Sequence, residues 1–277
     1  MPYTAEISRA NPACILFLLD QSGSMNATFG APGQTALPKA QSVADAINRL
    51  ISELVVTCTD GESVLDRFHI GVITYGGAQA CHAPGFQGLQ ALSEVATHPL
   101  RVDTRKQQVP DGAGGLVQQE TRFPIWFEPK ADGGTPMCHA ISLAKEVIEP
   151  WVASHPQSFP PIVFNITDGE GTDGDPLQSL RNIQACGTQD GGALTLNLFL
   201  ADGQGASMAY PTSFQHMPEG PLRSLVEGAS VLPDSMRRRA SQFHEMVLPE
   251  GARGVVLQAS LVDVIRLLDI GSRPINA

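Results

Sequence analysis

The 277-residue sequence has little of several features that define common classes of protein. Lysine and arginine are scarce, at 18 against 28 aspartates and glutamates, and the formal net charge is −10. This balance argues against a general binder of nucleic acid or of anionic membranes. No apolar run approaches the roughly 20 residues of a membrane-spanning helix. The apolar run Cys14–Leu19 ends in Asp20 without a small-residue cleavage site, so we expect no secretory signal and a cytoplasmic location.

The sequence also lacks closely spaced cysteines. None of its five cysteines forms a CxxC-type pair, which argues against zinc knuckles and redox motifs. We therefore expect free, buried thiols in a reducing compartment. Hydrophobic residues make up 42% of the chain, enough for a full core that needs neither disulfides nor a metal.

What the sequence does contain is an alternation of predicted strands and helices. Apolar runs predict strands at Cys14–Leu19, His69–Tyr75, Pro161–Thr167, Leu194–Leu200 and Gly254–Gln258. Helical periodicity predicts helices at Pro38–Val56, Pro136–Val152 and Asp175–Cys186, with a last helix capped by Ser260 and Asp263. The pattern is typical of an α/β fold with a doubly wound, mostly parallel central sheet and helices on both faces.

The periodicity is weaker at about residues 78–132. Thr97–Asp103 and Thr121–Glu128 are expected to pair as an extended hairpin around the turn Asp111-Gly-Ala-Gly-Gly. The segment has too few apolar residues for a core of its own. We interpret it as an insertion in a single domain that spans residues 12–271.

Oxygen-bearing side chains follow two predicted strands and precede one helix. Asp20 ends the first strand and is followed by Ser22 and Ser24, and Asp168 directly follows the third. Thr135 precedes the second long helix as its expected N-cap. In a parallel sheet these positions meet at one edge. A set of oxygen ligands without nitrogen or sulfur suits Mg²⁺, Mn²⁺ or Ca²⁺ and not zinc.

The motif D-x-S-x-S at Asp20, Ser22 and Ser24, followed by Thr135 and Asp168, resembles the metal-ion-dependent adhesion site of von Willebrand factor type A domains. GGTPM, which contains Thr135, opens the Pro136–Val152 helix, and ITDG, which contains Asp168, closes the Pro161–Thr167 strand. Both are similar to the sequences that surround the corresponding residues in the family. The final segment GARGVVLQASLVDVIRLLDIGS resembles the last strand and helix of bacterial intracellular members.

The resemblance implies a Rossmann-like fold, a bound Mg²⁺ and a role for each of the five residues. The hydroxyls of Ser22 and Ser24 would coordinate the ion directly, and Thr135 directly or through water. Asp20 and Asp168 would act mostly through water molecules. The remaining position would accept an Asp or Glu carboxylate from a partner protein, so the implied function is Mg²⁺-dependent protein binding without enzymatic activity.

Two alternatives remain open from the residues alone. A metal-dependent hydrolase would use the same ion as a Lewis acid, but it needs a general base close to a metal-bound water. The histidine closest in sequence is His139, which we expect on a helix surface beside a core thiol at Cys138. The second alternative is a purely structural metal. Asp173 and Asp175 lack the spacing of a calcium-binding EF-hand and are expected to form an acidic loop and an N-cap.

Overall fold

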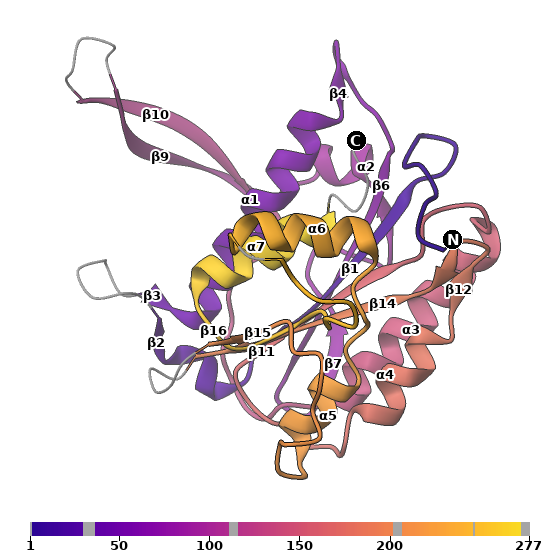
Figure 1. The fold of residues 1–277 in the computed structure, drawn as a ribbon. Helices are drawn as coiled ribbons and strands as arrows, with labels where there is room; N and C mark the ends of the chain where they lie inside the picture. Colours follow the sequence, from indigo (N-terminus) through magenta and orange to yellow (C-terminus); the bar gives the residue numbers. More distant parts are fainter. Residues whose placement is uncertain (1, 30–36, 111–115, 202–206, 246, 273–277) are drawn as a thin grey trace.

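The computed structural model describes residues 2–29, 37–110, 116–201, 207–245 and 247–272 (Figure 1). The strands of its central sheet are β1 (Ala13–Asp20), β6 (Phe68–Gly76), β7 (Gln79–His82), β8 (Gln90–Ala91), β11 (Ile162–Thr167), β14 (Leu194–Leu200), β15 (Met208–Ala209) and β16 (Val255–Ala259). They lie in the order β15-β16-β14-β11-β1-β6-β7, and β8 also pairs with β6. The five long strands in the middle are parallel to their neighbours, whereas β7, β8 and β15 are antiparallel.

The strand order reverses direction at the centre of the sheet. From β1 the chain builds outward through β6 to β7, then returns to the other side of β1 and builds outward through β11, β14 and β16. This is the order of a doubly wound sheet, and it confirms the predicted α/β class. The reversal lies between β1 and β11, and ligands of such sheets bind at that point, beyond the carboxyl ends of the strands.

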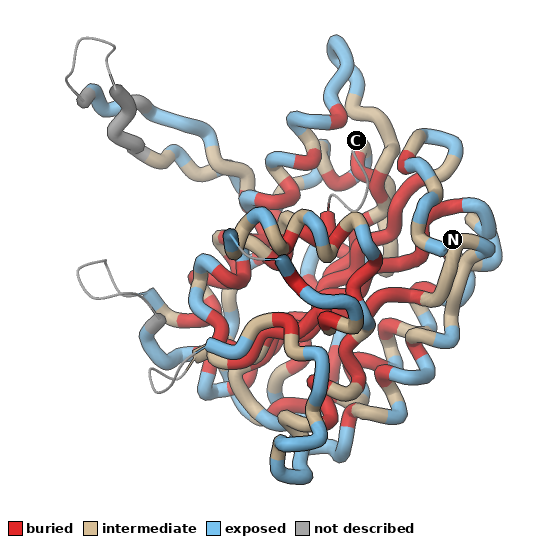
Figure 2. The backbone as a smooth tube through the Cα atoms, in the orientation of Figure 1, coloured by how far each residue is buried: buried red, intermediate tan, exposed pale blue. Residues whose placement is uncertain are grey.

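Helices cover both faces of the sheet (Figures 1 and 2). They are α1 (Lys39–Thr57), α2 (Leu92–Thr97), α3 (Met137–Ser154), α4 (Leu177–Gln184), α5 (Pro221–Glu227), α6 (Asp234–Phe243) and α7 (Leu261–Ser272). Ile15 and Phe17 of β1 belong to the core cluster that includes α1, α6 and α7, whereas Leu16 and Leu18 belong to the cluster that includes α3 and α4. Alternate residues of one apolar strand are thus buried on opposite faces.

Most of the predicted elements are present with small shifts at their ends. The last helix begins as expected, because the hydroxyl of Ser260 donates to Asp263 Oδ2 over 2.7 Å and the N–H of Asp263 points back to Ser260 Oγ at 3.3 Å. Among the helices in the described ranges, none is long and apolar enough to cross a membrane.

The expectation of five buried cysteines is wrong for three of them. All five are free thiols, but only Cys14 and Cys58 are buried, while Cys138 and Cys186 are partly exposed and Cys81 is exposed. Cys81 belongs to β7, an edge strand whose alternate side chains point to solvent. Cys138 follows the buried Met137 at the start of α3, so its thiol lies beside the core and not within it.

The segment at about residues 78–132, predicted to be an insertion, carries a long hairpin that projects from the body of the molecule (Figure 1). Its strands are β9 (Arg101–Pro110) and β10 (Leu116–Ile125), so they begin and end a few residues from the predicted positions. The predicted turn at 111–115 lies outside the described residues. Short strand pairs occur elsewhere: β2 (Thr28–Phe29) with β3 (Leu37–Pro38), β4 (Thr59–Asp60) with β5 (Ser63–Val64), and β12 (Gly187–Thr188) with β13 (Gly191–Gly192).

One buried amide holds the chain where it leaves the hairpin. The side chain of Asn48 on α1 accepts the N–H groups of Trp126 and Phe127 at 2.8 and 3.0 Å, and donates to the carbonyl of Phe127 at 2.8 Å. Asn48 is fully buried, so its three hydrogen bonds replace those it would make to water.

Candidate metal centre

Asp20 lies at the carboxyl end of β1 and is almost inaccessible to solvent. Its Oδ1 accepts the backbone N–H of Ser22 at 2.7 Å, and its Oδ2 accepts the hydroxyl of Thr167, the last residue of β11, at 2.6 Å. Burial raises the pKa of the Asp20 carboxyl, and the hydrogen bonds from Thr167 and Ser22 oppose that shift. Asp20 therefore joins the two strands on either side of the reversal.

Ser22, Ser24 and Asp168 form a chain of hydrogen bonds beside it. The hydroxyl of Ser24 donates to Asp168 Oδ1 over 2.6 Å, and the two serine oxygens lie 2.9 Å apart. Since Ser24 has only one hydroxyl proton, Ser22 is the donor in the serine pair. Lone pairs remain on both serine oxygens. Ser22 is buried, whereas Ser24 is exposed, so the group is open to solvent at Ser24.

Thr135 completes the group, although not as the helix cap that the sequence predicts. The position of a Cβ on Gly169 would lie 3.7 Å from Thr135 Oγ1 and 3.9 Å from Ser24 Oγ, so both hydroxyls face the same small region. Helix α3 begins at Met137 with Pro136 as its N-cap. The carboxylate of Asp173 accepts the N–H groups of Cys138 and His139 in the first turn of α3, at 3.0 and 2.8 Å.

The structure also places a residue there that sequence reasoning missed. Lys39, the first residue of α1, donates from Nζ to Asp168 Oδ2 over 2.9 Å. The Lys39 side chain is 4% exposed and that of Asp168 is 1% exposed. Nothing in the spacing around Lys39 distinguishes it from a lysine on a helix surface, because its contact with Asp168 joins segments far apart in the sequence.

The five predicted residues thus lie together at the point where the strand order reverses. The described residues contain no group of three or more His, Cys, Asp and Glu side chains that could hold a metal ion. The group instead offers two carboxylates and three hydroxyls, a donor set that fits a hard cation such as Mg²⁺ with water completing its shell. Thr167 and Lys39 support the two carboxylates from outside this set.

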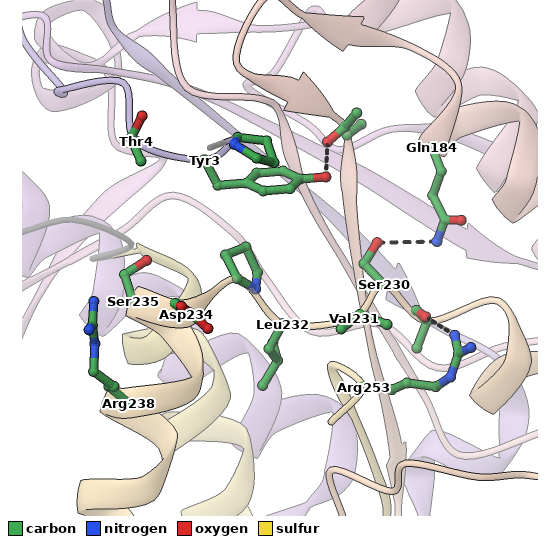
Figure 3. A pocket seen from close by; sticks show the side chains of 15 residues that line it. Tyr3, Thr4, Gln184, Ser230, Val231, Leu232, Asp234, Ser235, Arg238 and Arg253 are labelled. Atoms are coloured by element: carbon green, nitrogen blue, oxygen red, sulfur yellow. Dashed lines mark hydrogen bonds between the residues drawn. The ribbon is translucent and has the colours of Figure 1, made fainter. Parts of the chain in front are cut away.

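A cavity of about 850 Å³ lies at the opposite edge of the sheet, away from the candidate metal centre (Figure 3). Tyr3, Leu232 and Arg253 are among the residues that line it, together with Gly192 just before β14. Gln184 donates to Ser230 Oγ at 3.1 Å, and Arg253 donates to the carbonyl of Ala229 at 2.8 Å, whereas Ser235 Oγ and Arg253 Nε are buried without a partner among the described residues. None of the lining residues belongs to the group at the carboxyl edge, so the cavity is separate from it.

His139 lies on the exposed surface of α3, as predicted, and its Nδ1 accepts the backbone N–H of Ala80 at 3.0 Å. Cys138 beside it is not a reactive thiol, because desolvation and the nearby carboxylate of Asp173 raise its pKa to about 11. The pair therefore does not form a nucleophile and base.

Comparison with known proteins identifies no family for the chain. No protein-family model matches the sequence, and no curated protein is significantly similar to it. Among solved structures, proximal thread matrix protein 1 from the mussel byssus is similar with a TM-score of 0.47 and 13% identity over 94% of this chain. The von Willebrand factor domain of the type V pili tip protein Mfa5 from Porphyromonas gingivalis gives a TM-score of 0.32 and 13% identity over 58% of the chain. The chain spans 47% of the first protein and 39% of the second.

Proposed function

We propose that this protein is a Mg²⁺-dependent protein-interaction module of the von Willebrand factor type A kind, which binds an Asp or Glu side chain of a partner protein. The observation that carries the proposal is the grouping of Asp20, Ser22, Ser24, Thr135 and Asp168 at the reversal of the strand order. Five residues from three distant segments provide only oxygen donors there, and the group opens to solvent at Ser24.

In this proposal, three of the residues bind the ion directly and two act through water molecules. Ser22, Ser24 and Thr135 would hold the ion through neutral oxygens, and Asp20 and Asp168 would orient water molecules around it. When bound, Mg²⁺ supplies a positive charge with positions left for an outside oxygen ligand. Neutral ligands leave most of that charge uncompensated, which favours capture of a carboxylate. Mn²⁺ and Ca²⁺ share the preference for oxygen and are the alternatives to test.

A binding function accounts for the local chemistry better than hydrolysis does. A hydrolase needs a group free to accept a proton from a metal-bound water. Here Asp20 accepts two hydrogen bonds, Asp168 is paired with Lys39, and His139 Nδ1 is bonded to the main chain. We therefore propose no enzymatic activity. The same proposal places the protein in the reducing cytoplasm, where its five cysteines persist as thiols.

Calorimetric titration with Mg²⁺ tests the metal site directly. Wild type should bind one ion, and Asp20→Asn should bind it at least tenfold more weakly, because the substitution removes a charge and keeps the volume. Asp60→Asn is the matched control, since Asp60 is an exposed aspartate beyond the far end of α1. Equal binding by wild type and Asp20→Asn would overturn the assignment of the site.

A second experiment tests for the partner. The purified protein, immobilised in Mg²⁺, should retain an interacting protein from a cell extract and release it in EDTA. Mutation of acidic residues of the retained protein to amides should then identify the one that reaches the metal. Retention that EDTA and Asp20→Asn leave unchanged would place the interaction elsewhere, for example on the β9–β10 hairpin.

A further inference from the structure

The ion pair between Lys39 and Asp168 lies within the candidate metal centre and is sealed from solvent. The ammonium is 2.9 Å from Asp168 Oδ2, and both side chains are at most 4% exposed. Oδ1 of the same carboxylate accepts the hydroxyl of Ser24 at 2.6 Å. Both oxygens of Asp168 are therefore engaged, one of them by a full positive charge.

The position of Lys39 is fixed by its backbone as well as by its side chain. Its N–H donates to the carbonyl of Ala27 at 2.9 Å, just after the short helix η1 (Gly23–Asn26) that carries Ser24. Lysine is rarely buried unless it is paired, because an ammonium loses its hydration there. The fold thus holds an ammonium group next to the residues proposed to bind a metal.

The charges of Asp20, Asp168 and Lys39 determine the net charge of the site that a metal ion would enter. Asp20 and Asp168 contribute two negative charges and Lys39 one positive charge, so the site carries a net charge of −1. A divalent cation would change this to +1, whereas the same site without Lys39 would become neutral. The lysine therefore repels the incoming ion and leaves one positive charge that only an added anion can neutralise.

We propose that Lys39 is a positioning residue that weakens divalent-metal binding by the free protein and couples it to the binding of a carboxylate ligand. This inference rests on the metal site proposed above and adds regulation to it. Metal and partner would stabilise each other's binding, since each compensates a charge that the other leaves. The free protein would hold its metal weakly until an acidic side chain arrives.

The alternative hypothesis, that the ion pair between Lys39 and Asp168 is merely structural, makes a different prediction. If Lys39 only supports the fold, its removal lowers the free energy of unfolding and leaves metal affinity unchanged or lower. If it opposes the metal, its removal raises metal affinity even where the protein is less stable. Metal affinity is therefore the readout that separates the two.

The test is calorimetric titration of Mg²⁺ into wild type, Lys39→Gln and Lys39→Arg, with Lys145→Gln as control. Gln can still donate a hydrogen bond to Asp168 without a charge, and Arg keeps the charge. Lys145 is a more exposed lysine on α3 that pairs with Glu149, so Lys145→Gln makes the same change in net charge at another position. We expect Lys39→Gln to bind Mg²⁺ at least tenfold more tightly than wild type, while Lys39→Arg and Lys145→Gln bind as wild type does.

A second arm varies the anion and compares wild type with Lys39→Gln. Sodium acetate, compared with sodium chloride at equal ionic strength, should increase the Mg²⁺ affinity of wild type several-fold and that of Lys39→Gln by less. Thermal unfolding in EDTA checks that each protein is folded. Metal binding by wild type with no gain in Lys39→Gln, or with no effect of acetate on wild type, overturns this inference alone. Absence of metal binding by both proteins overturns the metal site as well.

Discussion

Thr135 contributes a neutral hydroxyl to the candidate metal centre, whereas Asp20 contributes a carboxylate. Replacement of Thr135 by Ala removes one ligand whose place a water can take, so we expect Mg²⁺ affinity to fall less than tenfold. Partner retention should fall more strongly if Thr135 helps to present the ion to a partner carboxylate, as proposed above. Calorimetry and retention on the same protein measure the two effects.

Asp20→Ala provides the contrast for that experiment. It removes a negative charge and leaves the Thr167 hydroxyl and the Ser22 N–H without their acceptor, so metal and partner should both be lost. The buried position also implies lower stability for this variant, which circular dichroism must check. Similar losses in Asp20→Ala and Thr135→Ala would contradict the separate roles.

His69 on β6 predicts a dependence of stability on pH. Its Nδ1 accepts the indole N–H of Trp151 at 2.8 Å, a bond that protonation of that nitrogen would break. Desolvation, followed by the nearby His155, lowers the pKa of His69 from its usual value of 6.5. Because the folded protein holds this proton more weakly than the unfolded chain, the stabilising contribution is complete above about pH 6.5 and decreases as the pH falls toward the lowered pKa.

Urea unfolding at pH 7.5 and 5.5 should therefore give a lower free energy of unfolding at pH 5.5. His69→Gln retains a hydrogen-bond acceptor without a titrating group, so it should reduce the difference between the two pH values. His216→Gln, at an exposed histidine, is the control and should leave the difference unchanged. An unaltered pH dependence in His69→Gln would show that other groups cause it.

Individual residues of the candidate metal centre were predictable where they directly follow a recognisable strand. Asp20 and Asp168 directly follow apolar runs, and a parallel sheet brings such strand ends to one edge. Lys39 was not predictable, since its ion pair with Asp168 joins the start of α1 to the end of β11, which are far apart in the sequence. Thr167 was hidden for another reason: as a β-branched residue in a strand, it has an ordinary place there without its hydrogen bond to Asp20.

At the scale of elements, Asp173 joins the loop after β11 to the start of α3. Its carboxylate accepts two N–H groups of the first turn, and its charge is favourable at that end of the helix. Asp173→Ala should therefore lower the free energy of unfolding by about 1–2 kcal/mol, as measured by urea unfolding. Asp173→Asn keeps one of the two acceptor oxygens and should cost less, and a cost equal to that of Asp173→Ala would contradict this expectation.

Asn48 provides a similar connection between α1 and the end of the β9–β10 hairpin. Asn48→Ala would leave two buried N–H groups and a buried carbonyl without partners, each costing about 1–3 kcal/mol if no water replaces the amide. We expect faster hydrogen exchange at the amides of Trp126 and Phe127 and a lower melting temperature. Unchanged exchange at those two amides would contradict the role of Asn48 as the anchor.

The elements themselves were largely predictable because their patterns are strong and local. The helices α1, α3 and α7 carry clear periodicity, and α7 has a capping box that can be recognised in the sequence. The predicted limits of the hairpin strands differ from those of β9 and β10 because most of the described positions in these strands are exposed, so no apolar pattern fixed the limits and the turn signal alone decided them. Thr135 was misassigned as a cap since a distant aspartate, Asp173, satisfies the helix instead.

At the scale of the whole molecule, the core does not depend on a metal. The two main hydrophobic clusters lie on the faces of the sheet, and the candidate centre lies at its edge. The protein should therefore be folded in EDTA by circular dichroism. Mg²⁺ at a hundredfold excess over its dissociation constant stabilises by about 2.7 kcal/mol, a rise of about 5–10 °C in melting temperature for a chain of this size. An unfolded metal-free protein would contradict this expectation.

The central place of β1 has a consequence for the protein as it leaves the ribosome. Of the strands in the central sheet, β1 is synthesised first. β6 can pair with one edge of β1 soon afterwards, but the other edge of β1 stays unpaired until β11 is synthesised. About ninety further residues must be synthesised, which takes roughly 5–20 s at typical rates of translation. During this interval the nascent chain presents an apolar, unpaired strand edge, so a chaperone that binds such edges would protect it at the stage when only its first half exists.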